Sequence, residues 1–452
     1  MSSVTVESVI GLSGVPVNFP TGIRFGGSAT GGINDIGIAG QAGFGLGICP
    51  GPLPSGMAEF PGTRNAVSDD YGNYKYSDGS VMVWIPAFYY KWGSGGNGIA
   101  LNSVDIKPFA SYNDIATANA AGYALHRAFY DGGRVQPGVF VDKYLCSNNG
   151  GIASSVKNGI PLSSAQRGSI AATAFSTLTG SPANNYGGAI AAAKTRGSSF
   201  FCNTRFIFSA LAMLAYAHGK SASSSTWCAW YDATGVNNFP KGCNNNALGD
   251  TNDASILYTI DGNGTYNCPL TGSANLFART AHNGQNSGGV DLNGTLWEIT
   301  PGLSSDGTNI YLLNTAVSMK SVTGGSGSSS DLWGASGLAA LYTSIGTTYA
   351  SLVKSNGWQY FGSTLNQVFD AAVSGNAWAI AGSGVPLVNG VGGTNAFGMD
   401  GMYQPSAWPN ELCPISSANW GDGSMAGVWS LNLNAVRASS YANIGFRSAL
   451  YL

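Results

Sequence analysis

The chain has 452 residues, of which only 9% are charged, and its formal net charge is −2. Ordinary soluble domains carry about 25% charged residues, so the surface is expected to be neutral and polar. The balanced charge, with no basic block along the chain, excludes a protein that binds nucleic acid through an electrostatic footprint. The aromatic content of 11% excludes a disordered chain.

Residues 1–75 are rich in glycine, and short apolar pairs recur between the glycines. This pattern favours short strands and tight turns over helices. Because such a segment would bury little apolar surface alone, we expect an attachment and oligomerisation region that packs on partner chains. The start of the chain lacks a basic region followed by an apolar stretch, so no secretory signal is expected. The sequence contains no run of about 18 apolar residues, so no membrane span is expected.

The elements of a globular domain are predicted from residue 76 onward. The apolar run VMVWI (81–85) predicts a strand. The segment TRFIFSALAMLAYAH (204–218) predicts a helix that is apolar on nearly all sides and therefore buried, and Gly219 is expected to end it. The remaining predicted elements are a helix over residues 331–345 and strands over residues 138–146, 295–300, 309–313, 427–434 and 443–452.

Candidate chemical groups are sparse. Seven cysteines are scattered without a CxxC pair, so most are expected to be reduced core residues. Structural roles are favoured for His126, His218 and His282, and His218 is expected to be an imidazolium at a helix C-terminus. The Asn/Asp-rich residues 244–255 offer oxygen ligands for Ca²⁺ but lack EF-hand spacing, so a polar loop is favoured over a calcium site.

Three phrases carry a family resemblance. They are PGVFVDKYLCSNN (137–149), HNGQNSGGVDLNGTLWEI (282–299) and RASSYANIGFRSAL (437–450). In this order they resemble the opening, central and terminal motifs of formylglycine-generating-enzyme-like domains. The resemblance implies an α+β fold of the C-type-lectin type with long irregular loops over residues 76–452, preceded by the attachment region.

The resemblance also implies structural roles for the residues that match its motifs. The tryptophan is expected to fill the core, Glu298 or its neighbours to bond loop backbones, and Arg447 to be paired within the fold. The matching residues are Asp291, Asn293, Gly294, Trp297, Glu298, Gly445, Phe446 and Arg447.

Enzyme activity of the family's kind is not expected. Formylglycine-generating enzymes use two active-site thiols that hold copper, and copper(I) requires soft thiolates. The corresponding segment here, VWSLNLNAVR (428–437), has no cysteine, and Ser448 stands where the family has its usual cysteine after G-F-R. Asp and Glu are also too sparse to nominate the facing carboxylates of a glycosidase. We therefore expect a protein without catalytic residues or a required cofactor.

Longer strings are similar to bacteriophage tail-fibre proteins, among them HRAFYDGG (126–133) and CAWYDATGVNNFPKGCNNNALGD (228–250). Residues 426–450 also resemble the variable region of proteins diversified by retroelements. These resemblances imply a fibre-tip protein of the virion, made in the host cytoplasm, that binds a host surface receptor such as a glycan, pilus or outer-membrane protein. A homotrimer and contacts to other tail proteins are expected, with no nucleic-acid partner and no membrane insertion. The alternative is a structural tail or baseplate component whose lectin-like domain packs only on other tail proteins.

The receptor-binding face is expected near the C-terminus. In a strand over residues 427–434 successive side chains would point to opposite faces. Trp429, Leu431 and Leu433 would then share one face and point inward. Exposed Trp and Tyr side chains with short polar neighbours can stack on a sugar or a protein. The alternative for each residue is a plain solvated loop. The expected binding residues are Trp420, Asp422, Met425, Ser430, Asn432, Asn434, Arg437, Ser440 and Tyr441.

Overall fold

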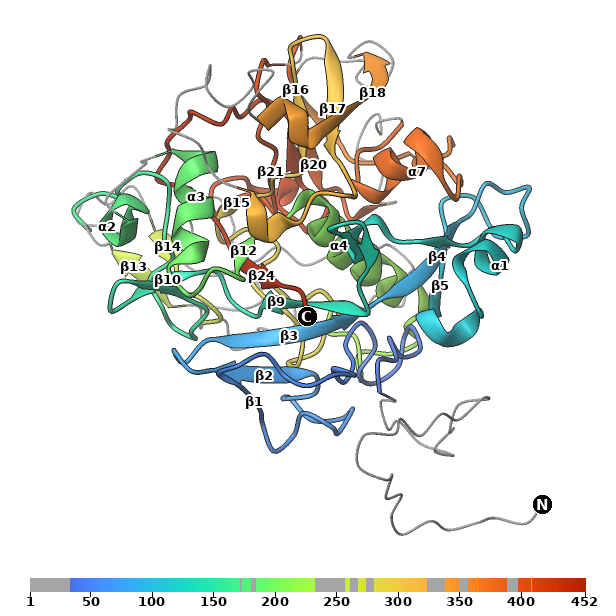
Figure 1. Cartoon of the computed structure of the whole chain (residues 1–452), viewed down its shortest axis with the longest axis horizontal. Coiled ribbons are helices and arrows are strands. Elements are labelled where there is room, and N and C mark those ends of the chain that lie inside the picture. The colour runs from blue at the N-terminus through green and yellow to red at the C-terminus, as the bar shows by residue number, and fades with distance from the viewer. Residues whose placement is uncertain are drawn as a thin grey trace.

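The computed structural model describes residues 33–170, 173–179, 184–231, 257–260, 267–273, 280–322, 338–348, 357–363, 365–387, 397–407 and 409–452. Several largely antiparallel sheets and few helices make up this part of the chain, which confirms an α+β fold. The long helix α4 (Arg205–Ser221) lies between two six-stranded sheets (Figure 1).

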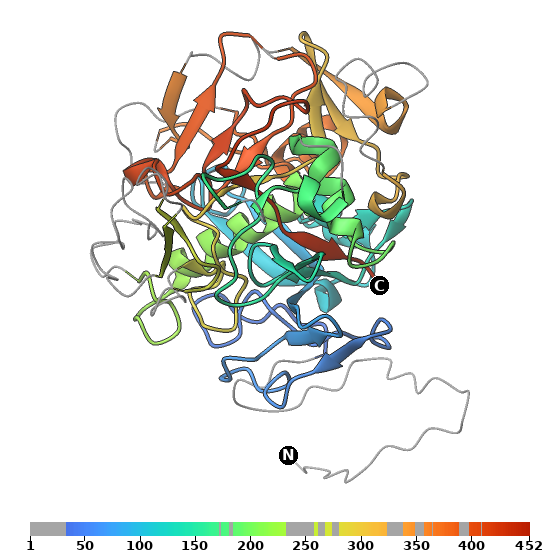
Figure 2. The same cartoon turned by 90° about the vertical axis from the view of Figure 1, so that its left-hand side faces the viewer.

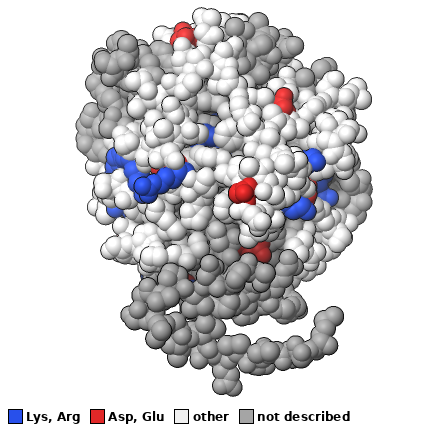
Figure 3. Space-filling model, turned by 45° about the vertical axis from the view of Figure 1, so that its right-hand side comes forward, with Lys and Arg blue, Asp and Glu red and all other residues white. Residues whose placement is uncertain are grey.

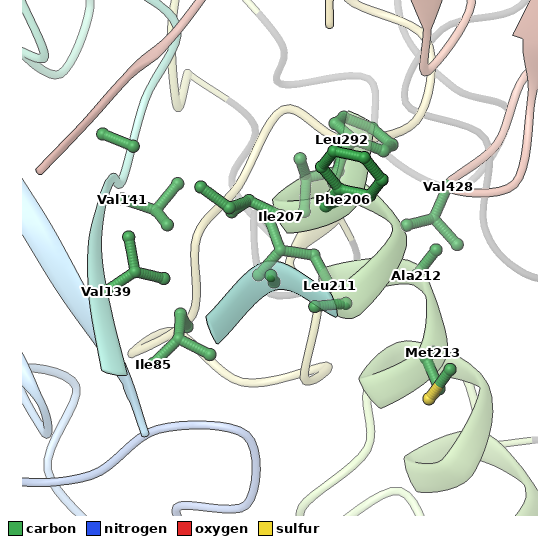
Figure 4. Close-up of a cluster of buried hydrophobic side chains, with 14 of the residues drawn as sticks. Ile85, Val139, Val141, Phe206, Ile207, Leu211, Ala212, Met213, Leu292 and Val428 are labelled. Atoms are coloured by element: carbon green, nitrogen blue, oxygen red, sulfur yellow. The ribbon is translucent and has the colours of Figure 1, made fainter. Parts of the chain in front are cut away.

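The first six-stranded sheet has the order β1-β2-β3-β9-β24-β12, and all neighbouring strands are antiparallel. Trp84 and Phe140 pack in a small cluster on one face, whereas Ile85 and Val139 on the other face point toward Ile207 of α4 (Figure 4). The strands are β1 (Met57–Glu59), β2 (Asn73–Tyr76), β3 (Val81–Pro86), β9 (Gly138–Asp142), β24 (Ser448–Leu450) and β12 (Phe201–Cys202).

The buried helix predicted from the sequence is confirmed as α4. The Thr204 hydroxyl caps it by accepting a hydrogen bond from the Ile207 backbone N–H at 3.2 Å. The helix continues through Gly219 to Ser221, so the expected end at Gly219 is wrong. A glycine within a helix costs only about 1 kcal/mol, which the burial of α4 outweighs.

The second six-stranded sheet has the order β19-β20-β22-β21-β15-β23, with the β20–β22 and β15–β23 pairs parallel. The buried guanidinium of Arg205 donates to Ser416 Oγ in β21 at 2.6 Å and so joins α4 to this sheet. Figure 2 shows its orange and red strands on the opposite side of the molecule from the blue β1 and β2. The strands are β19 (Gly357–Tyr360), β20 (Gly401–Gln404), β22 (Leu431–Asn432), β21 (Ile415–Ser416), β15 (Trp297–Ile299) and β23 (Ile444–Gly445).

Smaller sheets and short helices complete the architecture. Two three-stranded sheets contain β5 (Val104–Pro108), β4 (Phe88–Trp92) and β6 (Ala124–Leu125), and β16 (Leu303–Ser305), β17 (Asn309–Leu313) and β18 (Tyr342–Thr348). The hairpins are β7 (Tyr130–Asp131) with β8 (Arg134–Val135), β10 (Ser147–Asn149) with β11 (Ile152–Ser154), and β13 (Tyr258–Ile260) with β14 (Asn267–Pro269). The other α-helices are α1 (Ile115–Ala120), α2 (Ser176–Thr179), α3 (Asn185–Lys194) and α7 (Gly375–Gly382). Within the residues that the structure describes, no helix is both long and apolar enough to cross a membrane.

Two sequence predictions of elements are wrong. Of the strand expected over residues 427–434, only β22 is present. The Asp400 carboxylate accepts a hydrogen bond from the Trp429 backbone N–H at 2.8 Å, and the chain turns there. The helix expected over residues 331–345 is replaced, where it is described, by a short 3-10 turn and by β18, which pairs with β17. Residues 331–337 lie outside the described residues. The strand expected over residues 443–452 is divided into two short strands, β23 in the second sheet and β24 in the first. The strands expected over residues 81–85 and 309–313 are present, and those expected over residues 138–146 and 295–300 are present with shorter bounds.

The expected domain boundary at residue 75 falls inside β2. Phe44 and Leu46 belong to the main hydrophobic core, and β1 and β2 are part of the first sheet. Residues 33–75 therefore share a hydrophobic core and a sheet with later parts of the chain. Residues 1–32 lie outside the described residues, so an attachment role for them stays a prediction.

The buried guanidinium of Arg447 joins the three phrases that carry the family resemblance. Its Nε and one terminal nitrogen donate to the two carboxylate oxygens of Glu298 at 2.6 and 2.7 Å. The terminal nitrogens also donate to the carbonyls of Val290, Asp142 and Lys143. All five guanidinium N–H groups are thus used, and the expected pairing of Arg447 within the fold is confirmed.

The other motif residues have the structural surroundings that the resemblance implies. The Asp291 carboxylate accepts the Gly272 backbone N–H of a neighbouring loop at 3.0 Å, and Trp297 is buried. Asn293 and Phe446 are buried as well. Gly294 has a φ of +121°, and a Cβ at Gly445 would lie 2.6 Å from the Leu162 carbonyl oxygen.

Replacing Arg447 tests this network. Arg447→Met leaves the Glu298 carboxylate buried without its cation, and we expect a loss of about 3–5 kcal/mol in the free energy of unfolding. The matched control is Arg64→Met, which breaks the exposed pair with Glu59 and should cost no more than about 1 kcal/mol. Urea unfolding followed by circular dichroism measures both. Equal losses in the two variants would contradict the central role of Arg447.

Candidate functional site

The outward face of the second sheet carries a row of half-buried side chains. Trp358 of β19 pairs with Tyr403 of β20, and Tyr403 pairs with Asn432 of β22, so the three residues lie at one level across three neighbouring strands. The Trp358 and Tyr403 rings meet edge to face at 5.5 Å, and Trp358 stacks on Trp297 at 6.1 Å. We call Trp358, Tyr403, Asn432, Met425 and Asp422 the aromatic platform.

Small residues form the floor beneath the platform. At Gly401, on β20, an added Cβ would lie 2.7 Å from Met425 Cβ and 3.0 Å from the Trp358 ring. Met425 and Trp358 can therefore close over this strand only because position 401 has no side chain. Ser430, also near the floor, is buried and donates its hydroxyl to the Met425 carbonyl.

A tightly hydrogen-bonded loop places Asp422 at the side of the platform. Its Oδ2 accepts from the Asn419 backbone N–H at 2.8 Å and from the Asn419 side-chain amide at 2.7 Å. Burial raises the pKa of Asp422 to about 6, against the opposing effect of hydrogen bonds from Asn419 and the Trp297 side chain. Ser417 and Ala418 of this loop have positive φ values of 82° and 68°. The loop backbone is thus held in one specific conformation.

A layer of buried aromatic rings supports the platform from inside. Trp429 is fully buried and contacts the rings of Phe361, Phe369 and Phe397 at 5.2 to 5.4 Å. Trp92 stacks on Phe369 at 4.7 Å. The expectation that Trp429 belongs to the core is confirmed. Interlocked rings of this kind pack densely, so the sheet above them is rigid.

Three residues expected on the binding surface are buried instead. Trp420 is 2% exposed and packs with Leu145 and Leu296. Ser430 is fully buried in the floor described above. Arg437 is fully buried, because its guanidinium donates to Ser304 Oγ at 2.7 Å and lies over the Tyr186 ring. The prediction that these side chains are exposed is wrong. Ser430 is buried because the chain turns at Trp429, whereas Trp420 and Arg437 lie outside the expected strand and are buried by the contacts just given.

The remaining expected residues divide between two surfaces. Asp422, Met425 and Asn432 lie in the aromatic platform, and Asn434, whose side chain is exposed, follows β22. Ser440 and Tyr441 are exposed beside β23, at the other edge of the sheet, where they bond Ser164. The strand order separates β22 from β23 by two strands. The structure therefore does not bring the whole predicted group together.

Sequence analysis missed the two aromatic residues of the platform. Trp358 and Tyr403 lie in the short strings GWQY and GMYQ, neither of which was predicted as a strand. In GWQY two aromatic side chains flank a polar one, an alternation that could have indicated β19. GMYQ has no such alternation, so the sequence carries no comparable signal for β20.

The histidine and cysteine side chains that the structure describes are buried. All three histidines are buried, and burial lowers the pKa of His218 to about 4, so the expected imidazolium is wrong. The described cysteines are buried, and burial raises the pKa of Cys413 to about 12. Across the described ranges, no group of three or more His, Cys, Asp and Glu side chains could hold a metal ion. The Asn/Asp-rich residues 244–255 lie outside those ranges.

No protein-family model matches the chain, and no curated protein matches it. Among solved structures, the chain is similar to the Major Tropism Determinant U1 Variant, with 12% sequence identity and a TM-score of 0.29. The match covers 83% of this chain and 65% of that chain, so this chain spans about two thirds of that protein's length. Because a TM-score of 0.29 assigns no fold, the architecture of this chain is established by its own sheets and helices.

A substitution at the platform floor tests the packing described above. Gly401→Ala should displace Met425 and Trp358 because the new Cβ has no space. We expect a loss of about 1–3 kcal/mol in the free energy of unfolding and a changed fluorescence spectrum. The control is Gly79→Ala, where no atom lies within 4 Å but φ is +91°, so only backbone strain is added. A Gly401→Ala variant with unchanged fluorescence and stability would contradict the close approach.

Asp422 gives a pH-dependent prediction. Because its pKa rises from 3.8 to about 6 on folding, it contributes stability that is fully present below pH 3.8 and is lost as the pH rises through 6. The stability of wild type relative to Asp422→Asn should therefore fall between pH 4 and pH 7, by an amount on the order of 1–3 kcal/mol. Urea unfolding of both proteins across this range measures the difference. A difference that does not change with pH would show that Asp422 titrates normally.

Proposed function

We propose that this chain is the receptor-binding tip protein of a bacteriophage tail fibre, and that it binds a host surface molecule through the aromatic platform without catalysing a reaction. The fold proposed for it is a C-type-lectin-like domain of the formylglycine-generating-enzyme type. The receptor class is a glycan, a pilus or an outer-membrane protein. A homotrimer that attaches to other tail proteins would make weak single sites effective through multivalency.

The observation that carries the proposal is the half-exposed Trp358–Tyr403 pair on a rigid sheet. Aromatic side chains offer large contact areas at little entropic cost and are enriched among the residues that dominate binding energy. Asn432 and Asp422 place an amide and a carboxylate at the edge of the rings. An apolar surface with a few polar groups suits a neutral ligand. The face drawn in Figure 3 also has few charged side chains, in keeping with a neutral surface.

The buried state of the nucleophilic groups supports a binding role over an enzymatic one. Cys146 lies 3.6 Å from Ser448, the position at which the resembled enzymes have a cysteine, and 3.2 Å from Asp142. Burial raises the pKa of Cys146, so the thiolate needed to hold copper is disfavoured. With a serine as its neighbour, Cys146 also has no thiol partner at this position.

A structural role within the tail is the alternative. In that case the lectin-like domain packs only on other tail proteins, and the aromatic platform is a contact between virion subunits. The full chain and its variants distinguish the two functions when they are tested for binding to intact bacteria.

The test uses fluorescently labelled full-length protein and flow cytometry on a panel of bacterial strains. The site variant is Trp358→Ala/Tyr403→Ala, and the matched control is Tyr441→Ala, which removes an exposed aromatic side chain at the other edge of the sheet. We expect the site variant to need at least about tenfold more protein for half-saturation, since binding-site aromatics contribute about 2 kcal/mol or more. The control should bind as wild type does. Near-UV circular dichroism checks that both variants fold.

Other outcomes assign the function differently. Normal binding by a folded site variant contradicts the platform as the receptor face. Loss of binding only in Tyr441→Ala would move the receptor face to the β23 edge. Failure of wild-type protein to bind any strain, together with its capture by purified tail fibres lacking this chain, would favour the structural role.

A further inference from the structure

Two buried histidines hold one N-terminal segment against the body of the protein. The segment, residues 36–48, contributes Ile36, Phe44 and Leu46 to the main core. His218, in the last turn of α4, stacks its ring on Phe44 at 5.3 Å with an interplanar angle of 6°. Its Nδ1 accepts the Gly40 backbone N–H at 3.0 Å, and its Nε2 lies 2.6 Å from the Trp227 carbonyl oxygen.

His282 makes the equivalent contact a few residues further along the segment. Its Nε2 lies 3.0 Å from the Gly45 carbonyl oxygen, and its Nδ1 accepts the Gly289 backbone N–H at 3.1 Å. The adjacent Asn283 amide donates to the Phe44 carbonyl at 3.1 Å. The segment is therefore fixed from two sides, by the end of α4 and by the loop that contains His282.

The hydrogen bonds determine the protonation state of both rings. A nitrogen that accepts from a backbone N–H has no proton of its own, whereas a nitrogen facing a carbonyl must donate. Both rings are therefore neutral, with the proton on Nε2. Adding a proton to Nδ1 would place two N–H groups against each other and create a buried charge.

The charged groups around this contact do not compensate for such a charge. Beyond the effect of burial, the Arg447 guanidinium lowers the pKa of His282 because it opposes a second positive charge nearby, and a proton on His218 would do the same. Lys143 donates to the Asn286 carbonyl in the His282 loop, and Lys220 lies over the Tyr216 ring just after His218. Just before the segment, the Asp35 carboxylate accepts a hydrogen bond from the Gly37 backbone N–H.

We propose that residues 36–48 form an acid-released segment, which detaches from the body when His218 and His282 take up protons. Burial lowers the pKa of each to about 4, below the ordinary value of 6.5. The neutral rings thus contribute stability that is present above pH 6.5 and is lost as the pH falls toward 4. The segment leads to residues 1–32, so acid would loosen the connection between these residues and the folded body.

Hydrogen exchange measured by mass spectrometry on the full chain tests this inference. Exchange is compared at pH 7.5 and pH 5.0 after correction for the intrinsic effect of pH. The protection of peptides covering residues 36–48 should fall roughly tenfold or more at pH 5.0, whereas peptides from the buried part of α4 should remain protected. Unchanged protection of residues 36–48, or an equal loss in α4, would overturn the proposal.

The variants isolate the two histidines. His218→Asn/His282→Asn provides an amide oxygen in place of Nδ1 but does not titrate, so its segment should exchange at the same corrected rate at both pH values. His126→Asn is the matched control, because His126 is buried and its Nδ1 accepts from the Ala128 N–H away from this segment. The control should retain the pH dependence of wild type. Should the double variant fail to fold, the wild-type comparison of the segment with α4 still decides between local release and global unfolding.

Discussion

The buried guanidinium of Arg447 is the constraint on which the rest of the structure depends. It donates hydrogen bonds to the Glu298 carboxylate and to three backbone carbonyls, which come from two distant parts of the chain. A buried cation with all five N–H groups satisfied tolerates little displacement, since any lost partner leaves a desolvated charge. The next residue, Ser448, donates its backbone N–H to Asp142, which itself holds Arg196. Through these contacts the C-terminal residues hold β24 in the first sheet and β23 in the second.

This anchoring makes the second sheet a rigid support for the side chains on its outward face. The strands β15 and β23 are held at one edge by the Arg447 network, and α4 is joined to the middle of the sheet through Arg205. Buried aromatic rings fill the space beneath β20 and β22. The platform of Trp358 and Tyr403 therefore sits on regular strands, where side chains are positioned more accurately than on loops. A binding surface that is preorganised in this way loses little entropy when a ligand binds.

The sequence predicts the elements that are continuous apolar runs and the residues that have strict chemical roles. The apolar helix α4, the strand β3 and the pairing of Arg447 are examples. The failures arise where tertiary contacts override local pattern. Asp400, which directly precedes β20, accepts a hydrogen bond from the Trp429 backbone N–H where the chain turns, so the inferred alternation does not continue and Ser430 is buried. The pairing of Trp358 with Tyr403 joins residues 45 positions apart in sequence, a contact that no local pattern indicates.

The most direct test of the platform is to observe Trp358 itself during binding. Protein labelled with 5-fluorotryptophan gives one fluorine resonance per tryptophan, and a Trp358→Phe variant assigns the relevant one. On addition of solubilised envelope from a strain that the protein binds, the Trp358 resonance should shift or broaden, while the resonance of the fully buried Trp84 stays unchanged. Envelope binding that leaves the Trp358 resonance unperturbed would contradict the assignment of the aromatic platform as the receptor-binding face.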